Sequence, residues 1–415
     1  MPDRLIFHID VNSAFLSWEA TRRVQAGEPD LRLIPSAVGG EKDKRTGIIL
    51  AKSVPAKVFG IKTGEPVGMA LRKCPTLVIV KPDFHLYSRC SRAFIEICRR
   101  YAPVVEQYSI DECFLDMSGT AHLYPDPIAL ADEIRNTIRG ELGFTVNVGI
   151  GSNKLLAKTA GDFEKPDKTH TLFTEEIPAK LWPLPADALL YVGKATAEKL
   201  THARLFTVGD VAHAELRYLQ RLCGVKGGIM LYNYSHGIDN SPVCEEREAA
   251  KGYSAAVTLE ENITDRAASR QVLLALVDSV SARMRKDGAY CRSVGVTIRD
   301  TAFKNTSHQR KLPNPSDVTS ELAETADKLL LELWDGETPL RLLGVSLTDV
   351  THTPLEQLSL FPDAKKEKAR ALDKAMDAIR TKYGADTIFR GNTMQTQSAV
   401  DKKHKAREEE TREDE

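Results

Sequence analysis

Three acidic residues of this chain lie within segments that otherwise look like buried β-strands. Asp111 and Glu112 are neighbours in the largely apolar run Tyr108–Asp116, and Asp10 lies in the run Leu5–Asn12. Neighbours on a regular strand point to opposite faces, so Asp111 and Glu112 can share one site only at a hairpin end or a bend. Because strand interiors disfavour acids, three carboxylates converging from two strands suit a site for hard divalent cations such as Mg²⁺. The alternative is that the hairpin tip is solvated and that Asp10 merely ends its strand.

Three motifs together give the chain a family resemblance. They are His8-Ile9-Asp10-Val11-Asn12, Ser109-Ile110-Asp111-Glu112-Cys113-Phe114-Leu115-Asp116 and Gly149-Ile150-Gly151-Ser152-Asn153-Lys154-Leu155-Leu156-Ala157-Lys158. At this spacing they resemble the Y-family (translesion) DNA polymerases, of the bacterial polymerase IV and polymerase V kind, over roughly residues 4–395. The resemblance implies a template-directed DNA polymerase of low fidelity that extends primers past DNA lesions by two-metal nucleotidyl transfer.

The resemblance also implies roles for single residues. Phe15 is the expected steric gate, an aromatic ring lying where a ribose 2′-hydroxyl would fall, although the sequence by itself favours a core position on the first helix. Lys165 is expected to meet the triphosphate of the incoming deoxynucleotide, for which an ammonium group is a suitable point charge. Two Mg²⁺ ions are expected to be held by the Val11 carbonyl and by the catalytic residues Asp10, Asp111 and Glu112.

Two positions depart from the family pattern. Many members carry a Tyr-x-Ala-Arg motif whose Tyr and Arg touch the triphosphate, whereas this chain has Val54-Pro55-Ala56-Lys57. Lys57 keeps the charge but loses the two-pronged hydrogen bonding of arginine, which predicts a weaker grip on the nucleotide. Ala14 stands where an aromatic residue usually precedes the gate. That change widens the pocket or leaves it to be filled by a neighbour such as Trp18.

No other motif predicts a second catalytic centre. Gly149-Ile150-Gly151 lacks the Lys-Ser or Lys-Thr of a phosphate-binding loop. The seven cysteines include no Cys-x-x-Cys pair, so they indicate buried thiols in a reducing cytoplasm and not a disulfide framework or a zinc site. Lys154 and Lys158 are four residues apart on one predicted helix face, which is typical of a solvated surface, and we leave them out of the predicted site.

Length and composition predict a protein of several domains. A chain of 415 residues exceeds a single hydrophobic core, and its 42% hydrophobic content supports more than one. The net charge of −1 means that contacts with DNA must come from local basic clusters. No run of 18 apolar residues exists and the N-terminus does not look like a signal peptide, so no membrane span and a cytoplasmic protein are expected. The family resemblance implies a monomer.

The order of predicted elements indicates an α+β multidomain fold. Strands and helices alternate around the acidic hairpin, which suggests a ferredoxin-like palm. The resemblance implies a right-hand polymerase with small fingers, a helical helix–hairpin–helix thumb and a separate little-finger domain. The expected boundaries are palm 1–20 and 80–168, fingers 21–79, thumb 169–240, little finger 249–351, clamp-binding linker 352–363, a helical segment 364–395 with an amphipathic helix over 364–383, and a charged disordered tail 396–415.

Two regions are expected to contact the backbone of primer–template DNA. Glycine-containing turns at 192–195 and 224–228 look like helix–hairpin–helix turns, whose N–H groups meet phosphates without reading sequence, although ordinary turns between helices remain the alternative. The candidate contacts there are Gly193, Lys194, Lys226 and Gly227.

The second region is residues 251–351, where the predicted order is β-α-β-β-α-β. It is locally basic, which indicates either a surface along the duplex or a plain solvated face. The candidate contacts are Arg292 and Arg299, from a basic set that also includes Arg285, Lys286, Lys304, Arg310 and Lys311.

A short peptide follows the last predicted domain. Gln357-Leu358-Ser359-Leu360-Phe361 places leucine and phenylalanine outside any predicted core, where they need a pocket to bury them. It resembles the peptide by which bacterial polymerases dock on the ring-shaped sliding clamp. The expected clamp-binding residues are Gln357, Leu358, Leu360 and Phe361.

Two other functions compete with the polymerase. A nucleotide cyclase also uses paired acids on a similar palm, but the helix–hairpin–helix turns, the basic domain and the clamp peptide argue against it. A non-catalytic DNA- and clamp-binding accessory protein with a decayed nucleotide pocket would explain Val54, Lys57 and Ala14. The presence of all three acids argues against such decay.

Overall fold

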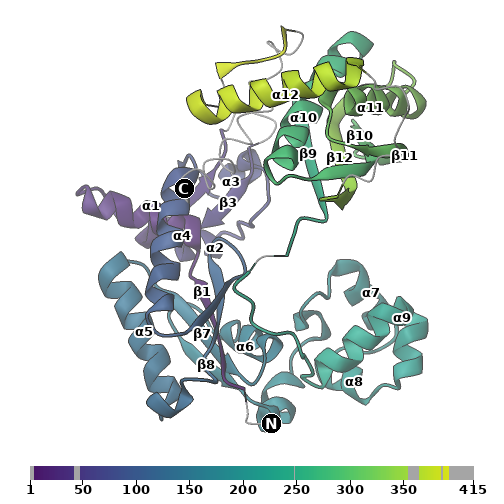
Figure 1. The fold of residues 1–415 in the computed structure, drawn as a ribbon. Coiled ribbons are helices and arrows are strands. Elements are labelled where there is room, and N and C mark those ends of the chain that lie inside the picture. Colours follow the sequence, from purple (N-terminus) through teal and green to yellow (C-terminus); the bar gives the residue numbers. More distant parts are fainter. Residues whose placement is uncertain (1–3, 42–46, 247, 354–363, 385–386, 392–415) are drawn as a thin grey trace. The chain divides into compact units, whose positions relative to one another are not determined.

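The computed structural model describes residues 4–41, 47–246, 248–353, 364–384 and 387–391 (Figure 1). These residues form two compact units that divide near residue 247, and each unit is described here by itself. The predicted clamp peptide and the charged tail lie outside the described residues. No helix within the described ranges is both long enough and apolar enough to span a bilayer.

The first unit is built around a five-stranded sheet with the order β5-β6-β1-β7-β8. β7 and β8 run parallel, and the other neighbours are antiparallel. A short turn joins β5 to β6, which confirms the predicted hairpin end at Asp111. The strands are β1 (Ile6–Val11), β5 (Val104–Gln107), β6 (Glu112–Asp116), β7 (Val146–Gly151) and β8 (Thr169–Leu172).

The two faces of this sheet are covered differently. Phe7, Ile9 and Val11 of β1 belong to a large core shared with α1 (Ala14–Gln25), α4 (Phe84–Arg99) and α5 (Pro127–Leu142). Ile6 faces the other way, toward α6 (Lys154–Gly161). Since strand side chains alternate, His8 and Asp10 share the face of Ile6. In Figure 1 the helices α4 and α5 lie on one side of the sheet and α6 on the other.

Helix α6 packs unusually closely on β7. A Cβ added at Gly149 would lie 2.0 Å from the Ala157 carbonyl oxygen and 2.3 Å from the Gly161 amide nitrogen. A Cβ at Gly151 would lie 2.8 Å from the Ala157 nitrogen. The helix begins at Asn153, whose side chain accepts a hydrogen bond from the Leu156 N–H at 2.9 Å and so caps it. The backbone of α6 therefore lies directly on the strand.

A second, three-stranded sheet of order β3-β2-β4 has its own small core. β2 pairs antiparallel with β3 and parallel with β4. This part of the unit contains η1 (Leu31–Leu33), β2 (Ser36–Gly39), β3 (Ile49–Lys52), α2 (Val54–Val58), α3 (Val67–Lys73) and β4 (Val78–Val80), and η2 (Ala121–Leu123) lies between β6 and α5.

The first unit ends in a helical module. Gly193 is the N-cap residue of α7, and Gly224, with φ of 81°, breaks α9 into two helices. Both predicted turns therefore lie at helix ends. The elements are η3 (Thr174–Glu176), η4 (Ile177–Leu181), η5 (Ala186–Ala188), α7 (Lys194–His202), α8 (Val208–His213) and α9 (Leu216–Ser235).

The second unit confirms the predicted β-α-β-β-α-β order. Its antiparallel sheet has the order β11-β10-β12-β9, and its core lies between the sheet and α10 and α11. The elements are β9 (Gly252–Ile263), α10 (Arg266–Lys286), β10 (Tyr290–Asp300), β11 (Asn305–Ser316), α11 (Thr319–Leu333) and β12 (Leu340–Thr351).

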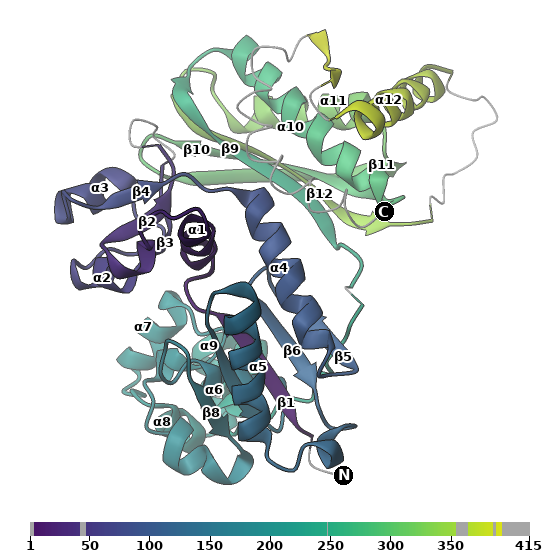
Figure 2. The same cartoon turned by 90° about the vertical axis from the view of Figure 1, so that its left-hand side faces the viewer.

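The predicted helix at 364–383 is present as α12 (Ala364–Tyr383), which packs against this second unit (Figure 2). Its acids and arginines form a buried ion cluster with α10. Arg285, whose side chain is only 7% exposed, bonds to Asp377, and Asp278 accepts from Arg380 and Arg390. Arg285 was counted above in a basic surface, and that prediction was wrong because its guanidinium points into the protein toward α12.

The close approach of α6 to β7 predicts a large stability cost for Gly149→Ala. The new methyl group would overlap backbone atoms that have no free rotamer, so we expect a loss of about 3 kcal/mol or more in the free energy of unfolding. Urea denaturation measures it. Gly140→Ala is the control, since that glycine is exposed in α5 with nothing within 4 Å of its added Cβ. This control should gain roughly 0.5–1 kcal/mol, and equal effects of the two changes would contradict the packing argument.

Candidate active site

The predicted acidic ligands meet at one end of the central strands. Asp10, the penultimate residue of β1, is the register partner of Glu112, the first residue of β6. The N–H of Val11 donates to the carbonyl oxygen of Asp111 at 3.0 Å, so the hairpin turn is tied to β1. The two strands thus bring all three predicted acids to neighbouring positions.

The hairpin turn fixes the position of Asp111. The N–H groups of Tyr108 and Ser109 both donate to the Glu112 carbonyl oxygen, at 3.0 and 3.1 Å. The Ser109 hydroxyl donates to Asp111 Oδ1 at 2.6 Å. Because Asp111 lies in the turn and not in a regular strand, its side chain need not point away from that of Glu112.

Two lysines neutralise the acids. Lys165 Nζ contacts Asp10 Oδ2 and lies 2.8 Å from Asp162 Oδ1. Lys158 Nζ donates to Glu112 Oε2 at 2.7 Å. Lys165 was predicted for the site, whereas Lys158 was assigned to a solvated face. That assignment was wrong, because α6 lies over the hairpin and turns this side chain inward.

Burial and these cations determine the protonation of the acids. Burial raises the pKa of Asp10, and the charge of Lys165 only partly opposes it. Burial would also raise the pKa of Glu112, but the nearby His8 ring and the hydrogen bond and charge of Lys158 outweigh it and lower that pKa to about 2. Burial lowers the pKa of His8, whose Nε2 is 3.6 Å from Glu112 Oε2. Glu112 is therefore an anion at neutral pH.

The donor set fits a hard divalent cation. Within the described residues, no three acidic, histidine or cysteine side chains already form a ready-made metal-binding group. The chemistry nevertheless suits Mg²⁺, since carboxylate oxygens at neighbouring positions are its preferred ligands. The ammonium groups beside Asp10 and Glu112 mark where positive charge is favoured.

Phe15 packs against the aromatic core at the start of α1. Its ring stacks on Tyr87 at 4.5 Å between centroids and lies 5.8 Å from the ring of Trp18. Trp18 is fully buried, while Phe15 is only partly buried at the start of α1. One face of the Phe15 ring thus joins the core, while the residue as a whole is not fully buried. Ala14 is buried beside it.

Lys57 is exposed on the short helix α2. Sequence analysis missed its neighbour Lys52, at the end of β3. Burial lowers the pKa of Lys52, and the positive charge of Lys57 lowers it further. The Lys52 ammonium group itself donates to the Thr63 hydroxyl at 3.1 Å. In the sequence, only the five-residue spacing of Lys52 and Lys57 across the end of a strand could have indicated that their charges interact.

The predicted DNA contacts are divided between the units. Lys194 and Lys226 are exposed; Lys194 directly follows Gly193, the N-cap of α7, and Lys226 lies two residues after Gly224, which breaks α9. Gly227 follows within the second half of α9. Arg292 and Arg299 lie half-buried on β10 in the second unit, where Arg299 donates to Asn305 Oδ1 at 2.6 Å.

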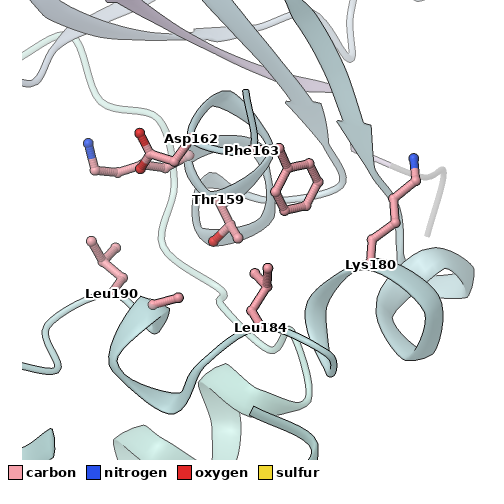
Figure 3. Close-up of a pocket in the computed structure, with 8 residues that line it drawn as sticks. Thr159, Asp162, Phe163, Lys180, Leu184 and Leu190 are labelled. Atoms are coloured by element: carbon pink, nitrogen blue, oxygen red, sulfur yellow. The ribbon is translucent and has the colours of Figure 1, made fainter. Parts of the chain in front are cut away.

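A cavity of about 490 Å³ lies beside α6. Figure 3 shows Thr159, Asp162 and Phe163 on one side and Leu184, Leu190 and Lys180 of the helical module on the other. Lys158 also lines it, so the cavity and the acids share α6 as a common wall.

Known protein families match most of the chain. The impB/mucB/samB family matches residues 9–162, and the C-terminal domain of that family matches residues 250–360. Between them, residues 189–239 match the DNA polymerase-iota thumb domain. These matches include the acidic hairpin, the helical module and the second unit.

Individual relatives agree with these matches. The chain is 40% identical over 388 residues to DNA polymerase IV of Clostridium acetobutylicum, which covers 93% of this chain and 97% of the relative. It is 34% identical to DNA polymerase IV 1 of Bacillus subtilis, covering 96% and 95%. A solved Y-family DNA polymerase chimera, 21% identical, shares the fold with a TM-score of 0.73 over 84% of this chain and 100% of its own. The chain therefore belongs to the Y family of translesion DNA polymerases.

Proposed function

We propose that Asp10, Asp111 and Glu112 carry out the nucleotidyl transfer of this DNA-directed DNA polymerase. The observation that carries the proposal is the register pairing of Asp10 with Glu112, each held by a lysine, beside a turn that presents Asp111. Enzymes of this family depend on divalent metal ions. We infer two Mg²⁺ ions held by these carboxylates and the Val11 carbonyl, which when bound would stabilise negative charge on the reacting phosphate.

The incoming deoxynucleotide would be bound by residues around the acids. Lys165 is the proposed phosphate contact, since its ammonium group already lies against a buried carboxylate and could exchange it for a phosphate oxygen. Lys57, with Lys52 close by, supplies further positive charge from the fingers. Phe15 is the proposed steric gate, supported by its incomplete burial and by the rigid stacking beneath it.

Contacts with primer–template DNA would come from both units. We propose that backbone phosphates meet the helix ends of the thumb and the sheet of the little finger, at Gly193, Lys194, Lys226, Gly227, Arg292 and Arg299. From the family resemblance we also propose the domain boundaries given above, a monomeric state and a cytoplasmic location. The division of the two units near residue 247 supports the little-finger boundary.

The non-catalytic alternative is not favoured. Relatives named DNA polymerase IV match over nearly their whole length, and the three acids are present. A nucleotide cyclase would not need the thumb domain match at residues 189–239.

Replacing Asp111 tests the catalytic assignment. Loss of a metal-binding carboxylate removes several kcal/mol of transition-state stabilisation, so Asp111→Ala should reduce primer extension by roughly a thousandfold or more. Extension of an end-labelled primer on intact and abasic templates measures it. Asp116→Ala, at the far end of the same strand β6, is the matched control and should retain most activity. Full activity of Asp111→Ala would refute the site.

Replacing Phe15 tests the steric gate. Phe15→Ala should admit ribonucleotides, raising the ratio of ribonucleotide to deoxynucleotide kcat/KM by about tenfold or more. Single-nucleotide incorporation kinetics provide that ratio. Phe84→Ala is the control, because the Phe84 ring packs edge-on against Tyr87, the residue on which the Phe15 ring stacks. If both variants alter sugar selection equally, general loosening of the aromatic cluster is the cause and the gate assignment is wrong.

Replacing the clamp peptide tests recruitment. We propose that Gln357, Leu358, Leu360 and Phe361 dock on a bacterial sliding clamp. The double change Leu360→Ala and Phe361→Ala should weaken binding to purified clamp by about 30-fold, since buried apolar anchors carry most of such affinities. Surface plasmon resonance would measure this loss. Ser359→Ala within the same peptide should bind like the unaltered protein, and unchanged binding of the double variant would rule the motif out.

A further inference from the structure

Two lysines on α6 make nearly identical ion pairs with two different glutamates. Lys154 Nζ donates to both carboxylate oxygens of Glu106 on β5, at 2.6 and 2.7 Å. One helical turn later, Lys158 Nζ donates to Glu112 Oε2 at 2.7 Å. Each lysine side chain is 14% exposed, and the glutamates are 19% and 21% exposed. The pairs differ in that Lys154 bonds to both oxygens of its partner and Lys158 to one, and in that Glu112 is a proposed metal ligand and Glu106 is not.

The ammonium group of Lys158 is itself fixed in place. It lies 5.4 Å from the centre of the Tyr108 ring, a cation–π distance. The Tyr108 hydroxyl is hydrogen-bonded at 3.0 Å to that of Tyr191 in the helical module. Gly149 and Gly151 of β7 leave room for α6, which carries Lys158, to pack directly on the sheet. Lys158 therefore has little freedom to leave Glu112.

We propose that Lys158 is a positioning residue that orients the Glu112 carboxylate for metal binding. It holds Oε2 and thereby limits the rotation of the carboxylate. This inference rests on the proposed role of Glu112 in the active site. Residues that orient metal ligands in this way are commonly needed for metal affinity even though they do not touch the metal.

Orientation and simple charge predict opposite effects. A positive charge beside a cation site repels the cation, so removing Lys158 would strengthen metal binding if charge alone mattered. If Lys158 orients Glu112, its removal frees the carboxylate to rotate and weakens metal binding. Lys154→Met is the control for losing one positive charge from the same helix. Its partner Glu106 is not a proposed metal ligand and also accepts the Cys244 N–H at 2.9 Å.

Direct metal binding distinguishes the two explanations without relying on turnover. Mn²⁺ is titrated into the protein bound to a dideoxy-terminated primer–template and the next deoxynucleotide, and free Mn²⁺ is followed by electron paramagnetic resonance. We expect Lys158→Met to weaken Mn²⁺ binding by about 10-fold or more and to raise the half-saturating Mg²⁺ for primer extension by a similar factor. Lys158→Arg should restore both to within a few-fold, and Lys154→Met should change neither by more than about twofold.

Unchanged or tighter Mn²⁺ binding by Lys158→Met, or an equal loss in Lys154→Met, would overturn the proposal. Thermal unfolding by circular dichroism checks that each variant folds. If Lys158→Met does not fold, Lys158→Gln is used in its place and should show the same loss of Mn²⁺ binding. Glu112→Gln is measured alongside. If Glu112→Gln binds Mn²⁺ normally, the proposed active site itself is wrong; if it binds weakly while Lys158→Met binds normally, only the role of Lys158 is wrong.

Discussion

The contact between α6 and β7 is the constraint on which the site depends. Gly149 and Gly151 allow the helix backbone to lie where any side chain would stand. That approach brings Lys158 within 2.7 Å of Glu112, a distance at which a hydrogen bond tolerates changes of only a few tenths of an ångström. A helix standing one methyl group further out would leave the acidic hairpin without this partner. The same helix forms one wall of the neighbouring cavity and ends just before Lys165.

The site is electrostatically balanced by the protein itself. Buried carboxylates without a partner destabilise a fold, and here Asp10 and Glu112 each have a lysine. The lysines thus let the chain fold with these two carboxyl groups close together. They also make each acid share its oxygens between an ammonium group and any incoming cation. If these acids hold the proposed metal ions, the ion pairs that stabilise the fold also influence metal affinity, and the exchange of Lys165 from Asp10 to a phosphate would link nucleotide binding to the charge of the site.

Local sequence patterns predicted the elements better than the contacts between them. The acids within β1 and β6, the β-α-β-β-α-β order and α12 all follow from short-range periodicity and turn residues. Lys158 was misassigned because two lysines four residues apart fit a solvated face as well as a face over the hairpin. Only the crossing of α6 over the sheet, set by Gly149 and Gly151, decides between them. Arg285 was misassigned for a similar reason, since its partners on α12 are remote in sequence.

The buried ion cluster of the second unit indicates that this unit extends further along the chain than the matched family domain. The matched family domain stops at residue 360, yet Asp278 of α10 is bonded by Arg380 and Arg390, and Asp317 by Arg370. A fragment that ends at residue 360 would lack these arginines and would leave Asp278 and Asp317 buried without them. A stable little-finger fragment therefore has to extend to at least Arg390, whose guanidinium bonds to Asp278 and Asp373.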